Sequence, residues 1–385
     1  MRRRLTRTAL AGLLGVTSAL GSTAVADEDT ARYVVLLRNT PALPGVVHTA
    51  TVLGGVVHRR FDALGAFSAD LTPADVDRLR QDPAVALVQE NRVHRVETAP
   101  AAAPAAVPWH TDRVDQRGLP LDGTFAPGGT GAGVDVYVVD SGVRTTHAEF
   151  EGRAESAYNA VADGNGDTDC AGHGTFVASH VAGRTYGVAK KANIKAVRVL
   201  GCDNSGTTED MADGMNWTAL NAPRGSVVNV SLQSSHGNTD TVLDAAAGKL
   251  VDNGMLVVLI AGNFARGDCR NSPKDPRAIT MGATTRTDSR NTGTNASSYG
   301  SCVTAFAPGA DVTGAGSSGD TAVLSGWYGT SFAAPLAAGA VAIAKEADPD
   351  LTLEQAVRLV VDRSTKGVLT DVGTGSPNRL LYAGS

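Results

Sequence analysis

Short apolar runs recur along the second part of the chain and are separated by longer segments of mixed character. Continuous runs of Val, Ile and Leu are typical of strands that are buried on both faces. Several of the segments between them are predicted to be helices, and strands that alternate with helices indicate a parallel sheet covered on both sides. The sequence therefore predicts an α/β domain. Its expected strands include residues 134–139, 194–200, 227–230, 256–260 and 278–281, and its expected helices include residues 208–220 and 242–253.

An earlier region has its own pattern and predicts a separate small domain. Residues 32–38 and 85–88 are apolar runs with β-forming residues. Between them, Thr72 can cap a helix that has Pro73 at its first position and carboxylates in its first turn. Residues 30–97 are therefore expected to form a small α/β domain. The Pro/Ala-rich stretch 100–108 cannot build a core and is expected to be a linker.

The first 26 residues predict a targeting segment. A basic start, Met1 to Arg4, precedes an apolar run over residues 9–20 and the small residues Ala24-Val25-Ala26. This order is typical of a secretory signal that is cleaved after Ala26. A short membrane anchor is the alternative, although the apolar run is too short and interrupted to span a bilayer securely.

Composition and charge narrow the class of protein. The 385 residues are 42% hydrophobic with 44 glycines, which is typical of a soluble globular protein rich in turns. A net charge of −5 gives no reason to expect a nucleic acid or an anionic membrane as partner. An even number of cysteines in an exported chain indicates disulfides, and these four allow three pairings. Zinc ligation is the alternative, but no two cysteines are close in sequence; they are Cys170, Cys202, Cys269 and Cys302.

Three polar residues stand at strand ends or helix starts in an order known for acyl-transfer enzymes. Asp140 ends an apolar strand, His173 lies in a Gly-His-Gly-Thr sequence, and Ser331 follows Gly-Thr before a run of small residues. Each residue alone is ordinary in a turn or cap. Together, in the order Asp, His, Ser, they predict an orienting carboxylate, a general base and a nucleophile.

A fourth residue supplies the hydrogen-bond donor that this chemistry requires. Asn263 follows the expected strand 256–260. Its side-chain amide, together with the N–H of Ser331, would stabilise the oxyanion of a tetrahedral intermediate. The sequence therefore predicts hydrolysis through an acyl-enzyme.

With these motifs the chain resembles the secreted subtilisin-like serine peptidases of the proteinase K branch, and among them the bacterial aqualysin-type enzymes. The resemblance implies an α/β, three-layer subtilisin-like domain with a central parallel sheet over residues 102–385. It implies that residues 27–101 hold a small α/β inhibitor propeptide and linker. It also implies the sequential disulfide pairs Cys170–Cys202 and Cys269–Cys302.

The family binds its substrate as an extra strand between two segments of the enzyme. In this sequence the matching segments are 204–207 and 231–233, and 260–262 matches the wall of the pocket for the residue before the scissile bond. The resemblance thus implies substrate contacts at Ser205, Gly206, Ser231, Leu232, Gln233, Ile260, Ala261 and Gly262.

Several positions depart from the family pattern, and we expect them to cluster around the cleft. Bulk at Gln233 and Ile260 should narrow or reroute the pocket, which suggests an active peptidase of altered specificity or modest activity. One alternative is a pseudopeptidase, a binding protein whose cleft is blocked by Gln233, Ile260 and Tyr328. Another is a hydrolase acting on esters. The departures are Phe176, Gln233, Ile260, Trp327-Tyr328 and Leu336.

The metal content is expected to differ from the family as well. Thr304 stands where the branch's strong calcium site has an Asp, so that site loses a charged ligand. Another set resembles an N-terminal calcium site of aqualysin-type enzymes, although a solvated acidic loop is the alternative. That set is Asp112, Asp115, Gln116 and Asp122. No organic cofactor is expected.

These observations predict a secreted serine endopeptidase made as a self-processing zymogen. Its partners would be protein or peptide substrates and its own propeptide, which would act as an intramolecular inhibitor. Cleavage is expected within residues 97–108, and the product is expected to be a monomer without nucleic-acid or membrane partners.

Overall fold

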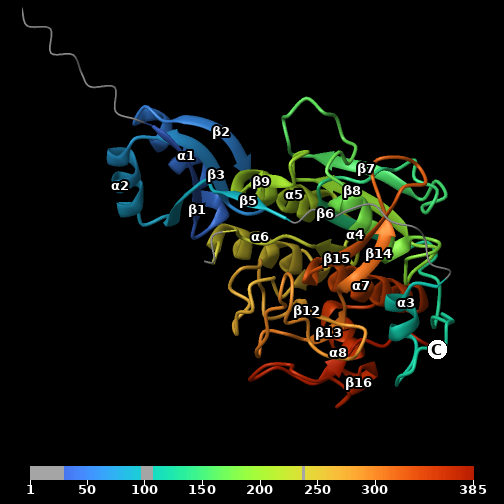
Figure 1. Ribbon diagram of the computed structural model, residues 1–385. Helices are drawn as coiled ribbons and strands as arrows, with labels where there is room; N and C mark the ends of the chain where they lie inside the picture. The colour runs from blue at the N-terminus through green and yellow to red at the C-terminus, as the bar shows by residue number, and fades with distance from the viewer. Residues whose placement is uncertain (1–29, 97–106, 236–238) are drawn as a thin grey trace, which may run out of the picture.

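The computed structural model describes residues 30–96, 107–235 and 239–385, which form a small domain and a large domain (Figure 1). The predicted signal segment, and most of the stretch in which cleavage is expected, lie outside these residues. Within the described ranges no helix is long and apolar enough to cross a membrane.

The small domain is a four-stranded antiparallel sheet of order β2-β3-β1-β4 with helices packed on one face. The predicted cap at Thr72 is confirmed, because its side chain accepts a hydrogen bond from the N–H of Asp75. Apolar residues of β1, β3 and both helices, among them Val35, Phe67 and Leu79, form its core. The elements are β1 (Ala31–Leu37), η1 (Thr40–Ala42), α1 (Leu43–Val52), β2 (Val56–Phe61), β3 (Ala66–Leu71), α2 (Pro73–Gln81) and β4 (Val85–Glu90).

The large domain is built on a nine-stranded sheet of order β16-β17-β13-β12-β11-β10-β6-β8-β7. All neighbours pair in parallel except β16 and β17. The predicted parallel sheet is confirmed. Its strands are β6 (Asp135–Asp140), β7 (Ala154–Asn159), β8 (Asn193–Arg198), β10 (Val227–Val230), β11 (Leu256–Ile260), β12 (Ile279–Thr284), β13 (Ala305–Pro308), β16 (Thr365–Lys366) and β17 (Arg379–Leu380).

Successive residues of the central strands enter two different cores, which is why helices cover both faces. In β6, Val136 and Val138 belong to one apolar cluster, whereas Tyr137 and Val139 belong to the other. The first cluster lies under α4 (His173–Ala182) and α7 (Thr330–Ala347), and the second lies under α5 (Thr208–Asn221) and α6 (Thr241–Asp252). The result is the expected three-layer arrangement.

The remaining elements lie at the edges of this arrangement. Both disulfides have the sequential pairing that the resemblance implied, Cys170–Cys202 and Cys269–Cys302, with Cα–Cα distances of 4.9 and 6.1 Å. The edge elements are α3 (Trp109–Val114), the hairpin of β14 (Ala310–Ala315) and β15 (Val323–Tyr328), and α8 (Leu353–Arg363).

The small domain packs its open sheet face on α5 and α6 of the large domain (Figure 1). Phe61 and Leu64 share one apolar cluster with Met211 and Met215 of α5. The side-chain oxygen of Asn216 accepts hydrogen bonds from the N–H groups of residues 63 and 64, at 2.9 and 3.2 Å. The two domains therefore share an apolar core and are held together by packing as well as by the chain that links them.

Charges of opposite sign surround this shared core. Arg59 of β2 lies 3.3 Å from Glu209, 3.1 Å from Asp210 and 3.3 Å from Asp213, all on α5. Because acidic residues occupy the first turn of α5, they also complement the positive end of its helix dipole. The interface thus combines apolar burial with a charge pattern that orients the small domain.

Candidate active site

Asp140 and His173 are brought together at the carboxyl end of the sheet. Asp140 is the last residue of β6, and His173 is the first residue of α4. Both side chains are fully buried, and Nδ1 of His173 lies 2.7 Å from Oδ1 of Asp140. A buried carboxylate bonded to Nδ1 fixes the imidazole tautomer in which Nε2 can accept a proton.

Asp169, which the sequence analysis did not single out, joins the segments that carry this pair. Its Oδ1 accepts from the hydroxyl of Ser141 and the N–H of Gly172, at 2.9 and 2.7 Å. Its Oδ2 accepts from the N–H and hydroxyl of Thr175, at 2.8 and 2.6 Å. Burial raises the pKa of its carboxyl, whereas these hydrogen bonds lower it. The only sequence signal was its place four residues before His173.

Ser331 lies beside this pair at the start of α7. The neighbouring Phe332 ring is 5.5 Å from the His173 ring, measured between centroids. The Ser331 hydroxyl donates to the carbonyl oxygen of Ser231 at 3.4 Å, and the Ser231 hydroxyl donates to the Ser331 carbonyl at 3.0 Å. The nucleophile candidate is thus held against the segment that follows β10.

Asn263 is oriented by the residue that precedes Ser331. It follows β11, and its Oδ1 accepts from both the N–H and the hydroxyl of Thr330, at 2.8 and 2.7 Å. Because two donors hold the oxygen end of the amide, the Nδ2 end is the one turned toward other groups. Donors fixed in this way before the reaction are what an oxyanion hole requires.

The segments predicted to bind substrate flank a strand of the small domain. Residues 93–95 form β5 (Val93–Arg95), which pairs antiparallel with β9 (Ser205–Thr207), and His94 lies opposite Gly206. The pairing continues with the N–H of Val96, which donates to the carbonyl of Asn204 at 2.9 Å. On the other side, the N–H of Arg95 donates to the hydroxyl of Ser235 at 2.5 Å. The small domain therefore places a strand in the groove where a substrate strand is expected.

The remaining predicted pocket residues divide between the pocket and the core. Gln233 is nearly buried, and its side-chain oxygen accepts from the N–H of Asn263 at 3.2 Å. Leu232 and Ala261 are buried in apolar clusters, and Gly262 adopts a positive φ of 95° just before Asn263.

The expectation that the family departures cluster in the cleft is wrong for Phe176, Ile260 and Leu336. All three are fully buried in the apolar core between the sheet and the pair α4 and α7. Phe176 stacks on Trp327 at 4.8 Å, and the Trp327 ring lies 5.7 Å from the His173 ring. These substitutions change the packing behind the imidazole, and Gln233 remains as the change beside the nucleophile.

Two carboxylates of the predicted calcium set fit a cation. Oδ1 of Asp112 and Oδ1 of Asp115 are buried and have no hydrogen-bond partner among the described residues. Burial raises the pKa of both carboxyls, and their mutual repulsion acts in the same direction for Asp115. A divalent cation would offset both the burial of the two carboxylate charges and the repulsion between them. Gln116 and Asp122 instead hold the loop, since the Gln116 oxygen accepts from the N–H of Asp122 and the Asp122 carboxylate binds Thr124.

The surroundings of Thr304 do not fit calcium. Its hydroxyl accepts from the N–H of Thr280 at 3.0 Å, and its carbonyl accepts from the guanidinium of Arg379 at 3.4 Å. A fixed positive charge and a committed hydroxyl stand at this place, which agrees with the loss of the ligand predicted there.

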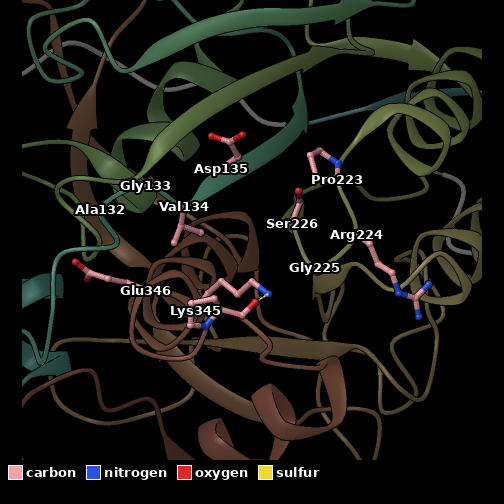
Figure 2. A pocket seen from close by; sticks show the side chains of 11 residues that line it. Ala132, Gly133, Val134, Asp135, Pro223, Arg224, Gly225, Ser226, Lys345 and Glu346 are labelled. Atoms are coloured by element: carbon pink, nitrogen blue, oxygen red, sulfur yellow. Dashed lines mark hydrogen bonds between the residues drawn. The ribbon is translucent and has the colours of Figure 1, made fainter.

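A pocket of about 280 Å³ lies at the other end of the strands, next to the first residue of β6 (Figure 2). Its charged groups are already engaged: Glu346 accepts from the N–H groups of residues 130 and 131, and Lys345 donates to the carbonyl of Pro349. No nucleophile paired with a base is found among its lining residues. We therefore place the active site at the carboxyl end of the sheet.

Comparisons with known proteins agree with this geometry. Residues 131–381 match the model of the subtilase family, Peptidase_S8. The chain is 40% identical over 321 residues to an extracellular serine proteinase of Thermus sp. (strain Rt41A), covering 83% of this chain and 76% of that protein. It is 38% identical over 325 residues to alkaline serine exoprotease A of Vibrio alginolyticus, covering 83% and 59% respectively.

A solved structure is also similar to this chain. The crystal structure of a cold adapted subtilisin-like serine proteinase is 40% identical, with a TM-score of 0.67, and covers 73% of this chain and 100% of that one. The chain therefore belongs to the subtilase family of serine peptidases.

Proposed function

We propose that this chain is the precursor of a secreted serine endopeptidase in which Asp140, His173 and Ser331 carry the reaction. The observation that carries the proposal is the buried 2.7 Å contact between His173 and Asp140, beside a serine at the first turn of α7. Its substrates are proteins or peptides, as for its peptidase relatives.

In the first step His173 accepts the proton of the Ser331 hydroxyl as the oxygen attacks the substrate carbonyl carbon. The imidazolium that forms is stabilised by Asp140, which stays ionised. His173 then gives the proton to the leaving amine, and the acyl group remains on Ser331. A water molecule repeats the sequence in reverse and releases the acid.

Asn263 stabilises the charge that develops on the substrate oxygen. Its Nδ2 and the backbone N–H of Ser331 are the proposed donors. Because Thr330 already holds the other end of the amide, little reorganisation is needed when the charge forms.

The small domain acts as an inhibitor in the same chain. Strand β5 lies along β9 as a substrate would, and the described strand ends at Val96. We therefore expect the chain to cut itself in the segment that directly follows Val96, within residues 97–108. Export is supported by the extracellular relative and by two disulfides, which form in oxidising compartments.

We further propose a structural calcium ion held by Asp112 and Asp115, whose orphan oxygens support it. The ion would supply positive charge that joins α3 to the loop after it. It takes no part in the reaction.

Mass spectrometry of the full precursor tests the proposed function. The unsubstituted chain is expected to lose the small domain by a cut within residues 97–108, whereas Ser331→Ala stays intact. Arg60→Ala serves as a control, since Arg60 is partly exposed and pairs with Asp62 in the small domain. An unsubstituted chain that folds and yet stays as intact as Ser331→Ala would mean that the protein is a binding protein on a peptidase fold.

A further inference from the structure

Two segments lie beside the nucleophile, residues 231–235 after β10 and residues 260–263 after β11, and the substrate residue before the scissile bond is expected between them. Ser231 contacts Ser331 directly. Across the pocket, the side chain of Gln233 reaches the backbone N–H of Asn263 at 3.2 Å. An amide side chain therefore bridges the two walls next to the reacting atoms.

A second amide lies beneath this bridge. A Cβ placed on Gly262 would lie 3.6 Å from Cβ of Asn271, so Asn271 packs against the wall residue that precedes Asn263. The carbonyl of Asn271 also accepts from the N–H of Ser234 at 2.7 Å. The loop that holds Gln233 and Ser234 is therefore joined to the loop that holds Asn271.

Two of these side chains are buried without hydrogen-bond partners. Asn271 is 0% exposed and Ser234 is 2% exposed. In the part of the chain that the structure describes, the oxygen and the nitrogen of the Asn271 amide have no hydrogen-bond partner. The Ser234 hydroxyl has none either. Because a buried polar group left unpaired is unfavourable, a ligand that pairs with these groups is favoured over an apolar one.

We propose that Asn271 and Ser234, with Gln233 as the polar wall, select a substrate residue before the scissile bond whose side chain ends in a carboxamide or a carboxylate. Asn271 Nδ2 and the Ser234 hydroxyl donate to the carbonyl-type oxygen that both groups present. A Phe or Leu side chain would leave both donors unpaired and would compete with Gln233 for space. The inference rests on the proposed peptidase function.

The test is a panel of peptide substrates that differ only at this one residue, cleaved by the enzyme that has processed itself. The variable residue is Gln, Glu, Phe, Leu or Ala. We expect kcat/KM for Gln or Glu to exceed that for Phe and Leu by about tenfold or more, because a site with buried polar groups rejects partners that cannot pair with them. The ratio of Gln to Glu shows whether the neutral or the ionised head is preferred, and either result supports the proposal.

Variants assign the selectivity to the named side chains. Asn271→Leu and Ser234→Ala are each expected to lower the ratio of kcat/KM for the preferred substrate to kcat/KM for the Ala substrate about tenfold. Ser272→Ala is the matched control, because this neighbouring buried hydroxyl already donates to the Pro273 carbonyl at 3.0 Å. A smaller loss of kcat/KM in Asn271→Gln than in Asn271→Leu would support a hydrogen-bonding role for the Asn271 amide.

Each way of failing has its own signature. A preference for Phe or Leu, or an equal loss on all substrates in Asn271→Leu, overturns the pocket proposal while the peptidase proposal stands. Failure to cleave any member of the panel, the Ala substrate included, overturns the peptidase proposal and the pocket proposal with it.

Discussion

Asp169 shows how a single residue can control the geometry of two others. Its carboxylate binds Ser141, next to Asp140, and the first turn of the helix that begins with His173. Since Gly172 offers no side-chain cap to that helix, Asp169 takes the place of one. It acts through its neighbours and is a positioning residue.

We expect Asp169→Asn to lower kcat about tenfold or more with little change in KM, because one oxygen is replaced by a donor that faces N–H groups. Steady-state kinetics on a short peptide substrate would measure both constants. Asp163→Asn is a suitable control, since the carboxylate of Asp163 pairs with Arg198 of β8. A change confined to KM would contradict the positioning role.

The buried His180 makes the stability of the protein depend on pH. Burial lowers its pKa from 6.5 to about 4, and it packs against His110, whose pKa burial also lowers. The folded state therefore favours the neutral ring. The neutral ring of His180 contributes roughly 3 kcal/mol to the free energy of unfolding above pH 6.5. This contribution is lost as the pH falls toward 4.

His180→Phe is expected to flatten the loss of stability between about pH 6.5 and 4. Denaturant unfolding of the Ser331→Ala chain, with and without this substitution, would measure the free energy of unfolding at each pH. Acidic residues contribute equally to both chains, so the difference reports His180 together with its effect on the neighbouring His110. If the free energy of unfolding changes equally with pH in both chains over this range, His180 does not cause the pH dependence.

At the scale of elements, strand β2 carries the polar part of the contact between the domains. Arg59 pairs with the acidic first turns of α5, whereas its neighbour Arg60 pairs with Asp62 of the small domain. Arg59→Ala is expected to shorten the lag between linker cleavage and full activity, because the cut domain dissociates sooner. Arg60→Ala should leave the lag unchanged, and continuous assay of freshly processed precursor measures it. An unchanged lag in Arg59→Ala would mean that the affinity of the cleaved small domain for the large domain comes from apolar burial alone.

The strands β6, β8, β10, β11 and β12 and the helices α5 and α6 could be predicted from the sequence, because these strands are buried apolar runs with a strong signal. In the small domain, α1 and β2 were not predicted. The α1 sequence has Gly and β-branched residues, which are poor helix formers, and it is held by packing of Leu43, Val46 and Ala50 on the sheet. Strand β2 is polar and is defined by its pairing with β3.

The candidate site could be predicted only in part for a related reason. Asp140, His173, Asn263 and Ser331 stand in recognisable motifs. Asn271 and Ser234 are single polar residues in separate loops, and only the fold brings them together. The expected bulk of Ile260 in the pocket was wrong because its place in β11 directs it into the core.

At the scale of the whole molecule, calcium is expected to stabilise the large domain. An ion at one hundred times its dissociation constant adds about 2.7 kcal/mol, which corresponds to a rise in Tm of roughly 5–10 °C for a domain of this size. Thermal unfolding of the Ser331→Ala chain with calcium and with a chelator would measure the shift. Asp112→Asn and Asp115→Asn should abolish it, and Asp122→Asn should retain most of it. No shift in the parent chain would argue against the site.

Strand β5, which we propose to be inhibitory, belongs to the same chain as the strand β9 with which it pairs, and this has a consequence for how activity begins. Before the linker is cut, the strand is held near the groove at an effective concentration of about millimolar, whatever the amount of protein in solution. After the cut the same contact becomes bimolecular. Dilution, which cannot activate the intact precursor, is then sufficient to free the enzyme, so activity would rise fastest where the secreted protein spreads thinly from the cell.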